Sequence, residues 1–238
     1  MKTNLEEANL KALEIYEAYT KIKVGDLTLT TPYFINVVEN IYKDLFKQEN
    51  VDPEKVKVFF GKIAKGETPI CPHRGKGTPA QIQESLHRLL VYLGHSNYAN
   101  FILTPDQILA FMKIYHIGVD CSGFVYNILE YSLPSQIWEQ QKALLYWGDP
   151  EKMQVSRAGV FVFNSTKLET VENIKDLQPL DLIVWKNNSH MSIIVSIDGV
   201  LVVAESALVR GVSTFEVEKL VKKHSNEFTI KRLTRFAN

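Results

Sequence analysis

The sequence predicts an α+β protein in which helices come first and an antiparallel sheet follows. Apolar residues recur at helical spacing in several segments of the first 115 residues or so. After residue 180 the pattern changes to short apolar strands, two of which are joined by the turn Asp198-Gly199. Helices followed by hairpin-connected strands are typical of the α+β class.

The helices of the N-terminal region, residues 1–115, are indicated by their apolar faces and by their starts. Residues 5–22 have helical spacing, and Thr31-Pro32 opens a second apolar stripe. A third helix begins at Asp52-Pro53, which supplies an N-cap and a proline at the first helical position. Capping boxes open two more helices, at Thr78–Gln81 and Thr104–Gln107. No strand is expected in this region.

The C-terminal region, residues 116–238, begins with helices and continues as a sheet. Helical spacing predicts one helix from Cys121 to Tyr131 and another over 135–146. A helix or mixed segment is expected at 214–223. Strands are expected at 180–186, 190–197, 200–206 and 227–233.

Composition argues against several functional classes. The 238 residues carry 27 basic and 27 acidic side chains, a balance that gives no general attraction to nucleic acid or to acidic lipid. The N-terminus lacks the apolar core of a signal peptide, and no apolar run approaches the roughly 20 residues that span a bilayer. The two cysteines, Cys71 and Cys121, fit a reducing compartment. We therefore expect a cytoplasmic protein with no nucleic-acid or membrane partner.

The most specific local pattern surrounds Cys121, in the segment Gly118–Val125. It places a cysteine at the start of a helix, where partial positive charge stabilises a thiolate and backbone N–H groups can receive an oxyanion. Asp120 is a candidate N-cap, and Gly123 keeps side-chain bulk away from a substrate. A buried structural cysteine on a helix is the alternative interpretation.

A thiol nucleophile needs a base, and His190 is the candidate. It opens an apolar strand directly after the polar turn at 186–189, so it can face a cleft while the strand enters the core. A cysteine and a histidine within hydrogen-bond reach form an activated thiol. By itself, a histidine at this position is also compatible with a solvated or capping role.

The register of the predicted hairpin suggests a third group. With the turn at 198–199, the next strand runs back beside His190, whose partner falls near 206–208. Glu205 is the polar residue nearest that level, and its carboxylate can accept the other imidazole N–H. A glutamate at the exposed end of a strand is the alternative.

The motif DCSGFV is followed later in the chain by the segment Pro179–Ile183 and by a strand that begins at His190. This order of motifs resembles the NlpC/P60 superfamily of papain-like cysteine peptidases and amidases. The resemblance covers about residues 116–206 and implies a papain-like fold with an antiparallel sheet packed on the nucleophile helix. Cys121 and His190 match the family's cysteine and histidine. Glu205 falls near the third position, where His, Asn or Gln is more usual, and Leu180 replaces a customary glycine.

The resemblance also implies a substrate and oxyanion site around the nucleophile. Family members often carry a Pro-Tyr dipeptide whose tyrosine lines the site, and Pro32-Tyr33 resembles it although it lies far upstream. Tyr33 would then serve this site together with Asp120 and Ser122, and residues 38–115 would be a helical insertion. A first-turn tyrosine that covers the core is the alternative for Tyr33.

Two weaker patterns are interpreted as structural. The segment Arg74–Thr78 lacks the spacing of a phosphate-binding loop and reads as a flexible loop that leads into a capping box and can border the cleft. Cys71 and the nearby histidines at 73, 87 and 95 do not have the spacing of a zinc site. No pattern in the sequence indicates a metal or an organic cofactor.

The function that the resemblance implies is thiolate-mediated hydrolysis of an amide bond, with a bacterial cell-wall peptide or muropeptide as the substrate. A different amide, a thioester or an acyl-lipid substrate stays open. So do a non-catalytic peptide- or glycan-binding domain, an acyltransferase on the same fold and an interaction protein. The sequence leaves the oligomeric state open.

Overall fold

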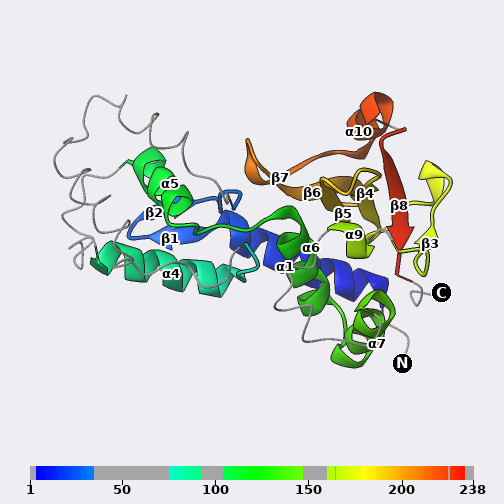
Figure 1. The fold of residues 1–238 in the computed structure, drawn as a ribbon, viewed down its shortest axis with the longest axis horizontal. Coiled ribbons are helices and arrows are strands. Elements are labelled where there is room, and N and C mark those ends of the chain that lie inside the picture. Colours follow the sequence, from blue (N-terminus) through cyan, green and yellow to red (C-terminus); the bar gives the residue numbers. More distant parts are fainter. Residues whose placement is uncertain are drawn as a thin grey trace.

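The structure, a computed structural model, describes residues 4–34, 75–92, 104–146, 160–163, 165–224 and 226–233. These residues form helices and antiparallel sheets, so the predicted α+β class is confirmed (Figure 1). The helices are α1 (Leu5–Thr20), α4 (Pro79–Tyr92), α5 (Pro105–Ile114), α6 (Cys121–Ser132), α7 (Ser135–Tyr146), α9 (Val160–Phe163) and α10 (Val217–His224), with the 3-10 helix η2 at Ile174–Asp176. The strands are β1 (Ile22–Val24), β2 (Leu27–Leu29), β3 (Glu169–Thr170), β4 (Leu182–Trp185), β5 (Met191–Ile197), β6 (Val200–Ala207), β7 (Gly211–Glu216) and β8 (Phe228–Arg232).

A six-stranded antiparallel sheet in the order β3-β8-β4-β5-β6-β7 is the centre of the fold. One face packs on α1 and α6 through residues such as Met191 and Ile193. The other face carries a second core, which includes Ile194 and Val203, and α10 covers it. In Figure 1, α1 and α6 lie below the sheet and α10 lies above it. Both faces are buried, which explains the nearly continuous apolar sequence of β4 and β5.

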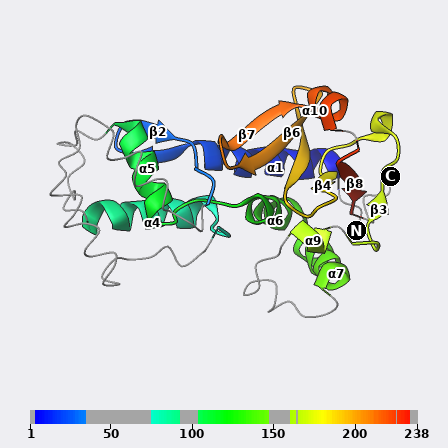
Figure 2. The same cartoon turned by 45° about the horizontal axis from the view of Figure 1, so that its top comes forward.

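A second group of elements lies at the end of the molecule away from β3 and β8, as Figures 1 and 2 show. There the hairpin β1-β2 packs against α4 and α5. The chain then returns from α5 toward the sheet and enters α6 at Cys121.

The hairpin between β5 and β6 forms as predicted. Asp198 and Gly199 both have positive φ, 51° and 79°, as a type I′ turn requires. The register that follows from this turn places Ile193 opposite Ala204. This register decides which residues of β6 lie near the start of β5, where His190 is found.

The capping boxes are also confirmed. At the start of α5 the N–H of Gln107 donates to the Thr104 hydroxyl at 3.3 Å, and the Gln107 side chain accepts from the N–H of Thr104 at 2.9 Å. Thr78 and Gln81 make the same pair of bonds before α4. These local rules hold because both partners lie within four residues of each other.

Two predictions for the N-terminal region are wrong. Thr31-Pro32 does not begin a helix, because residues 31–34 are not helical and Tyr33 forms a bridge with the distant Val119. The hairpin β1-β2 was not expected, although apolar residues alternate on both sides of Gly25-Asp26, a turn-forming pair. The rest of the second helix, and the helix expected at Asp52-Pro53, lie outside the described residues.

Near the C-terminus, the mixed segment divides into the end of β7 and the helix α10, which begins at Val217. Within the described parts of the chain, no helix is both long enough and apolar enough to cross a bilayer.

Candidate active site

Cys121 is the first residue of α6, and the residue before it explains why. The Asp120 carboxylate accepts a hydrogen bond from the N–H of Gly123 at 2.6 Å, and the Asp120 carbonyl accepts one from Phe124 at 2.9 Å. These bonds start the helix at Cys121. Cys121 therefore lies where the helix carries partial positive charge, and it is 4% exposed.

The segment that leads into α6 is held from three directions. Val119 forms a parallel bridge with Tyr33 and an antiparallel bridge with Lys76. The Ser206 hydroxyl, from β6, donates to the Val119 carbonyl at 2.7 Å. Three distant parts of the chain thus determine the position of the cysteine.

Gly123 is required by the packing of the neighbouring segment of the chain. A Cβ atom at this position would lie 2.2 Å from the carbonyl oxygen of Gly75. The same carbonyl accepts a hydrogen bond from the N–H of Asp120 at 2.9 Å. The glycine in the cysteine motif therefore makes room for a neighbouring piece of backbone, which a side chain would push away from α6.

His190 precedes β5, and Glu205 lies in β6 at the same end of the sheet. Since Ile193 pairs with Ala204, Ser192 stands opposite Glu205, and His190 lies two residues further along the same face. Nε2 of His190 and Oε2 of Glu205 are 2.7 Å apart. The hairpin geometry therefore brings imidazole and carboxylate into hydrogen-bond contact.

The imidazole of His190 contacts Cys121 as well. Burial lowers the pKa of His190, but hydrogen bonds with Cys121 and Glu205, and the charges of both groups, outweigh burial and raise it to about 9. Nε2 of the ring is the nitrogen that faces Glu205, and the same ring interacts with the Cys121 thiol. The raised pKa favours the protonated ring, whose side chain is 21% exposed.

Tyr33 reaches the same sulfur atom. Burial raises the pKa of Tyr33, and the charges of Cys121 and Asp120 and a hydrogen bond with Cys121 raise it further. The phenol therefore keeps its proton and can donate a hydrogen bond. Its position depends on the strand bridge to Val119, not on the helix that was expected.

The two residues that flank the cysteine are held by a lysine that sequence reasoning missed. Lys76 Nζ donates to both Asp120 carboxylate oxygens, at 2.8 and 2.9 Å, and to the Ser122 hydroxyl at 2.6 Å. The sequence placed this lysine only in a loop that can border the cleft. Its partners follow 44 and 46 positions later, so local pattern could not pair them.

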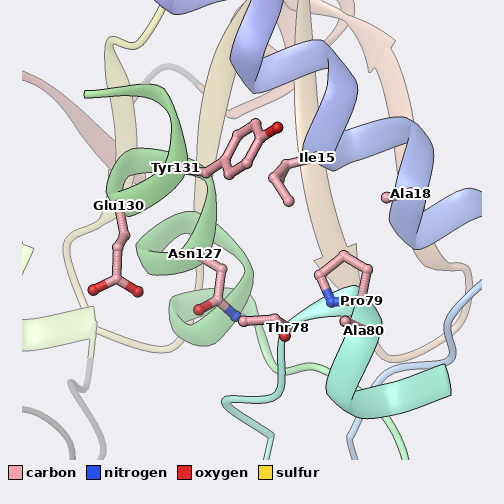
Figure 3. A pocket seen from close by; sticks show the side chains of 8 residues that line it. All are labelled: Ile15, Ala18, Thr78, Pro79, Ala80, Asn127, Glu130 and Tyr131. Atoms are coloured by element: carbon pink, nitrogen blue, oxygen red, sulfur yellow. The ribbon is translucent and has the colours of Figure 1, made fainter. Parts of the chain in front are cut away.

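A hollow of about 430 Å³ lies elsewhere, between α1, α4 and α6 (Figure 3). Its lining residues are Ile15, Ala18, Thr78, Pro79, Ala80, Asn127, Glu130 and Tyr131. None of the predicted site residues is among them, so this hollow is separate from the surroundings of Cys121.

The structure brings the predicted site residues into one connected cluster, which consists of Tyr33, Asp120, Cys121, Ser122, His190 and Glu205. The cluster joins a thiol, an imidazole and a carboxylate, a combination that can support acyl transfer. No protein-family model, curated protein or solved structure matches the chain, so its chemistry is inferred from this geometry.

Proposed function

We propose that the chain is a papain-like cysteine hydrolase of the NlpC/P60 type that cleaves an amide bond. Cys121 is the nucleophile, His190 is the general acid and base, and Glu205 orients the imidazole. The observation that carries the proposal is the His190 ring, which contacts the sulfur and the carboxylate together. A nucleophile, a base and an orienting third group form the general pattern of activated thiol and hydroxyl nucleophiles.

The electrostatics of the cluster favour catalysis over a purely structural role. Glu205 and His190 are largely buried, although burying charged groups is costly unless they are paired. An imidazolium and a helix N-terminus both stabilise a thiolate, which is the nucleophilic form of cysteine. A structural cysteine needs neither of these neighbours.

In the first half of the proposed reaction, the Cys121 thiolate attacks the carbonyl carbon of the amide and forms a C–S bond. Negative charge passes to the carbonyl oxygen, and we assign its stabilisation to the N–H of Cys121 and the Tyr33 hydroxyl. The His190 imidazolium donates its proton to the amide nitrogen, the C–N bond breaks, and the amine leaves. The product on the enzyme is a thioester.

In the second half, neutral His190 takes a proton from water while the water oxygen attacks the thioester carbonyl. The C–S bond then breaks, the carboxylic acid leaves, and the thiolate and imidazolium are restored. Glu205 accepts the hydrogen bond of Nε2 throughout and thereby fixes the orientation of the ring toward Cys121.

For the substrate we propose a bacterial cell-wall-type peptide or muropeptide, because residues 116–206 resemble a family that acts on such peptides. For the location we propose the cytoplasm, where these peptides are available during cell-wall recycling.

A hydrolysis screen tests the proposal directly. Muropeptides, γ-glutamyl amides and acyl thioesters are incubated with the wild type and with Cys121→Ala and His190→Ala. We expect the wild type to cleave at least one amide and each variant to lose about a thousandfold or more in rate. Turnover by Cys121→Ala at the wild-type rate would exclude the proposed nucleophile.

Alkylation by iodoacetamide separates the enzyme from a binding or interaction protein without a known substrate. We expect Cys121 to react faster than Cys71 at neutral pH and to slow in His190→Ala. Equal and slow labelling of the two cysteines would favour the non-catalytic alternatives.

A further inference from the structure

Lys76 is joined to both neighbours of the proposed nucleophile, yet the proposed reaction does not use it. Its Nζ donates to the Asp120 carboxylate and to the Ser122 hydroxyl. The Lys76 and Asp120 side chains are 20% and 19% exposed, whereas the ion pair of Lys21 with Glu17 is 59% and 57% exposed. Solvent and salt screen a partly buried pair much less than a surface pair.

The backbone around Lys76 is held as closely as its side chain. Asn127 of α6 donates to the carbonyls of Lys76 and Gly77 at 3.1 and 3.2 Å. The Tyr19 hydroxyl of α1 donates to the Gly77 carbonyl at 2.8 Å. The ammonium of Lys76 is therefore a positive charge with a defined position next to the first turn of α6.

The charges around Cys121 explain why such a cation matters. His190 and Tyr33 contact the sulfur, Glu205 acts through His190, and Asp120 is the adjacent residue. The Asp120 carboxylate caps the helix one residue before Cys121, and a negative charge near a thiol disfavours its ionised form. An ammonium bound to that carboxylate cancels the unfavourable charge while the cap stays in place.

We propose that Lys76 is a positioning residue of this site, which neutralises the Asp120 carboxylate and fixes Ser122 so that Cys121 is maintained as a thiolate. Lys76 acts through Asp120 and Ser122 and takes no part in bond making. This inference rests on the proposed function, because a thiolate matters only if Cys121 is the nucleophile.

The test follows the alkylation of Cys121 by iodoacetamide between pH 5 and pH 10, with the Cys121 peptide quantified by mass spectrometry. Lys76→Met keeps most of the aliphatic stem and removes the charge. We expect it to slow alkylation at pH 7 by about threefold to tenfold and to move the profile to higher pH. Lys76→Arg keeps the charge and should stay close to the wild type.

A second substitution separates charge from structure. Asn remains a good helix cap, so Asp120→Asn removes the unfavourable charge and leaves the start of α6 intact. The double variant Lys76→Met/Asp120→Asn should therefore recover most of the wild-type alkylation rate. Lys21→Met, which removes a cation from the exposed pair with Glu17, is the matched control and should leave the profile unchanged.

A wild-type pH profile in Lys76→Met would overturn the inference, and so would a double variant that stays as slow as Lys76→Met. The second result would indicate that Lys76 only maintains the structure. Failure of the proposed function looks different, because wild-type Cys121 would then react no faster than glutathione in the same solution.

Discussion

His190 lies between a sulfur atom and a carboxylate, and both contacts favour its protonated form. Two opposing effects act on this one ring, since burial favours the neutral imidazole and the two partners favour the imidazolium. The effect of Cys121 and Glu205 is larger than the effect of burial, and it raises the pKa of His190 to about 9. Two predictions at the scale of the residue follow from this balance.

The first prediction concerns stability and pH. Since the pKa of His190 rises from 6.5 to about 9 on folding, its contribution to stability is complete below about pH 6.5 and is lost as pH rises through 9. We expect the difference in unfolding free energy between wild type and His190→Gln to shrink between pH 6 and pH 10. The change should be on the order of 1–3 kcal/mol.

Urea denaturation at both pH values measures this difference. A gap that stays constant, or that widens toward pH 10, would show that the folded imidazole does not carry the raised pKa.

The second prediction concerns Glu205. Glu205→Gln keeps the shape of the side chain but removes the charge that faces Nε2, so the pKa of His190 should fall below about 9. Amide hydrolysis at pH 7 should fall by at least about tenfold. An NMR titration of the His190 ring measures the first effect, and initial rates measure the second.

Glu227→Gln is the matched control, because Glu227 lies 3.0 Å from His224 in a similar pair outside the site. This substitution should change neither the His190 titration nor the hydrolysis rate. Equal effects of the two substitutions would show that Glu205 has no specific influence on the His190 ring.

At the scale of the element, α6 depends on close contact with the chain around Gly75. The helix packs on α1, on α7 and on the strands β5 and β6, while its first turn contacts residues 75–77. A single backbone carbonyl fills the space that any side chain at position 123 would need. The start of the helix and the adjacent segment therefore form one structural unit.

This contact predicts that Gly123→Ala destabilises the protein. Alanine is the better helix former by about 1 kcal/mol, so a helix-propensity argument predicts a gain in stability. The clash at 2.2 Å instead predicts a net loss of about 2 kcal/mol or more. Urea denaturation distinguishes the two, with the exposed Glu130→Ala of the same helix as a control near zero.

At the scale of the whole molecule, α1 joins the N-terminal residues to the sheet. The Asn9 side chain donates to the Ser196 carbonyl at 2.9 Å and accepts from the Ser196 N–H at 2.8 Å. It thereby pairs with the backbone of β5 as a neighbouring strand would. Only 8% of Asn9 is exposed, so the loss of its amide would leave the N–H and carbonyl of the half-buried Ser196 without this partner.

We therefore expect Asn9→Ala to lower the free energy of unfolding by about 1–3 kcal/mol. The neighbouring Leu10→Ala should change it little, because Leu10 is 56% exposed. Thermal and urea unfolding of both variants provide the comparison. Equal stability of Asn9→Ala and wild type would show that α1 does not depend on this contact.

The features that the sequence determined by itself are those with local causes. The capping boxes, the start of α6 at Cys121 and the turn at Asp198-Gly199 each depend on residues that lie a few positions apart. The proximity of His190 and Glu205 could also be predicted from the sequence, because the two-residue turn sets the register of the two strands that it joins.

Tertiary structure alone decided which distant segments meet at Cys121. Tyr33 bridges to Val119 although local pattern favoured a helix at that point. The reason is that the backbone groups of its neighbours Pro32 and Phe34 find their hydrogen-bond partner in Val119, far along the chain. The contacts of Lys76 could not be predicted either, because its partners Asp120 and Ser122 are far from it in the sequence. Local propensity is a weak preference of tenths of a kcal/mol per residue, and backbone pairing and burial readily override it.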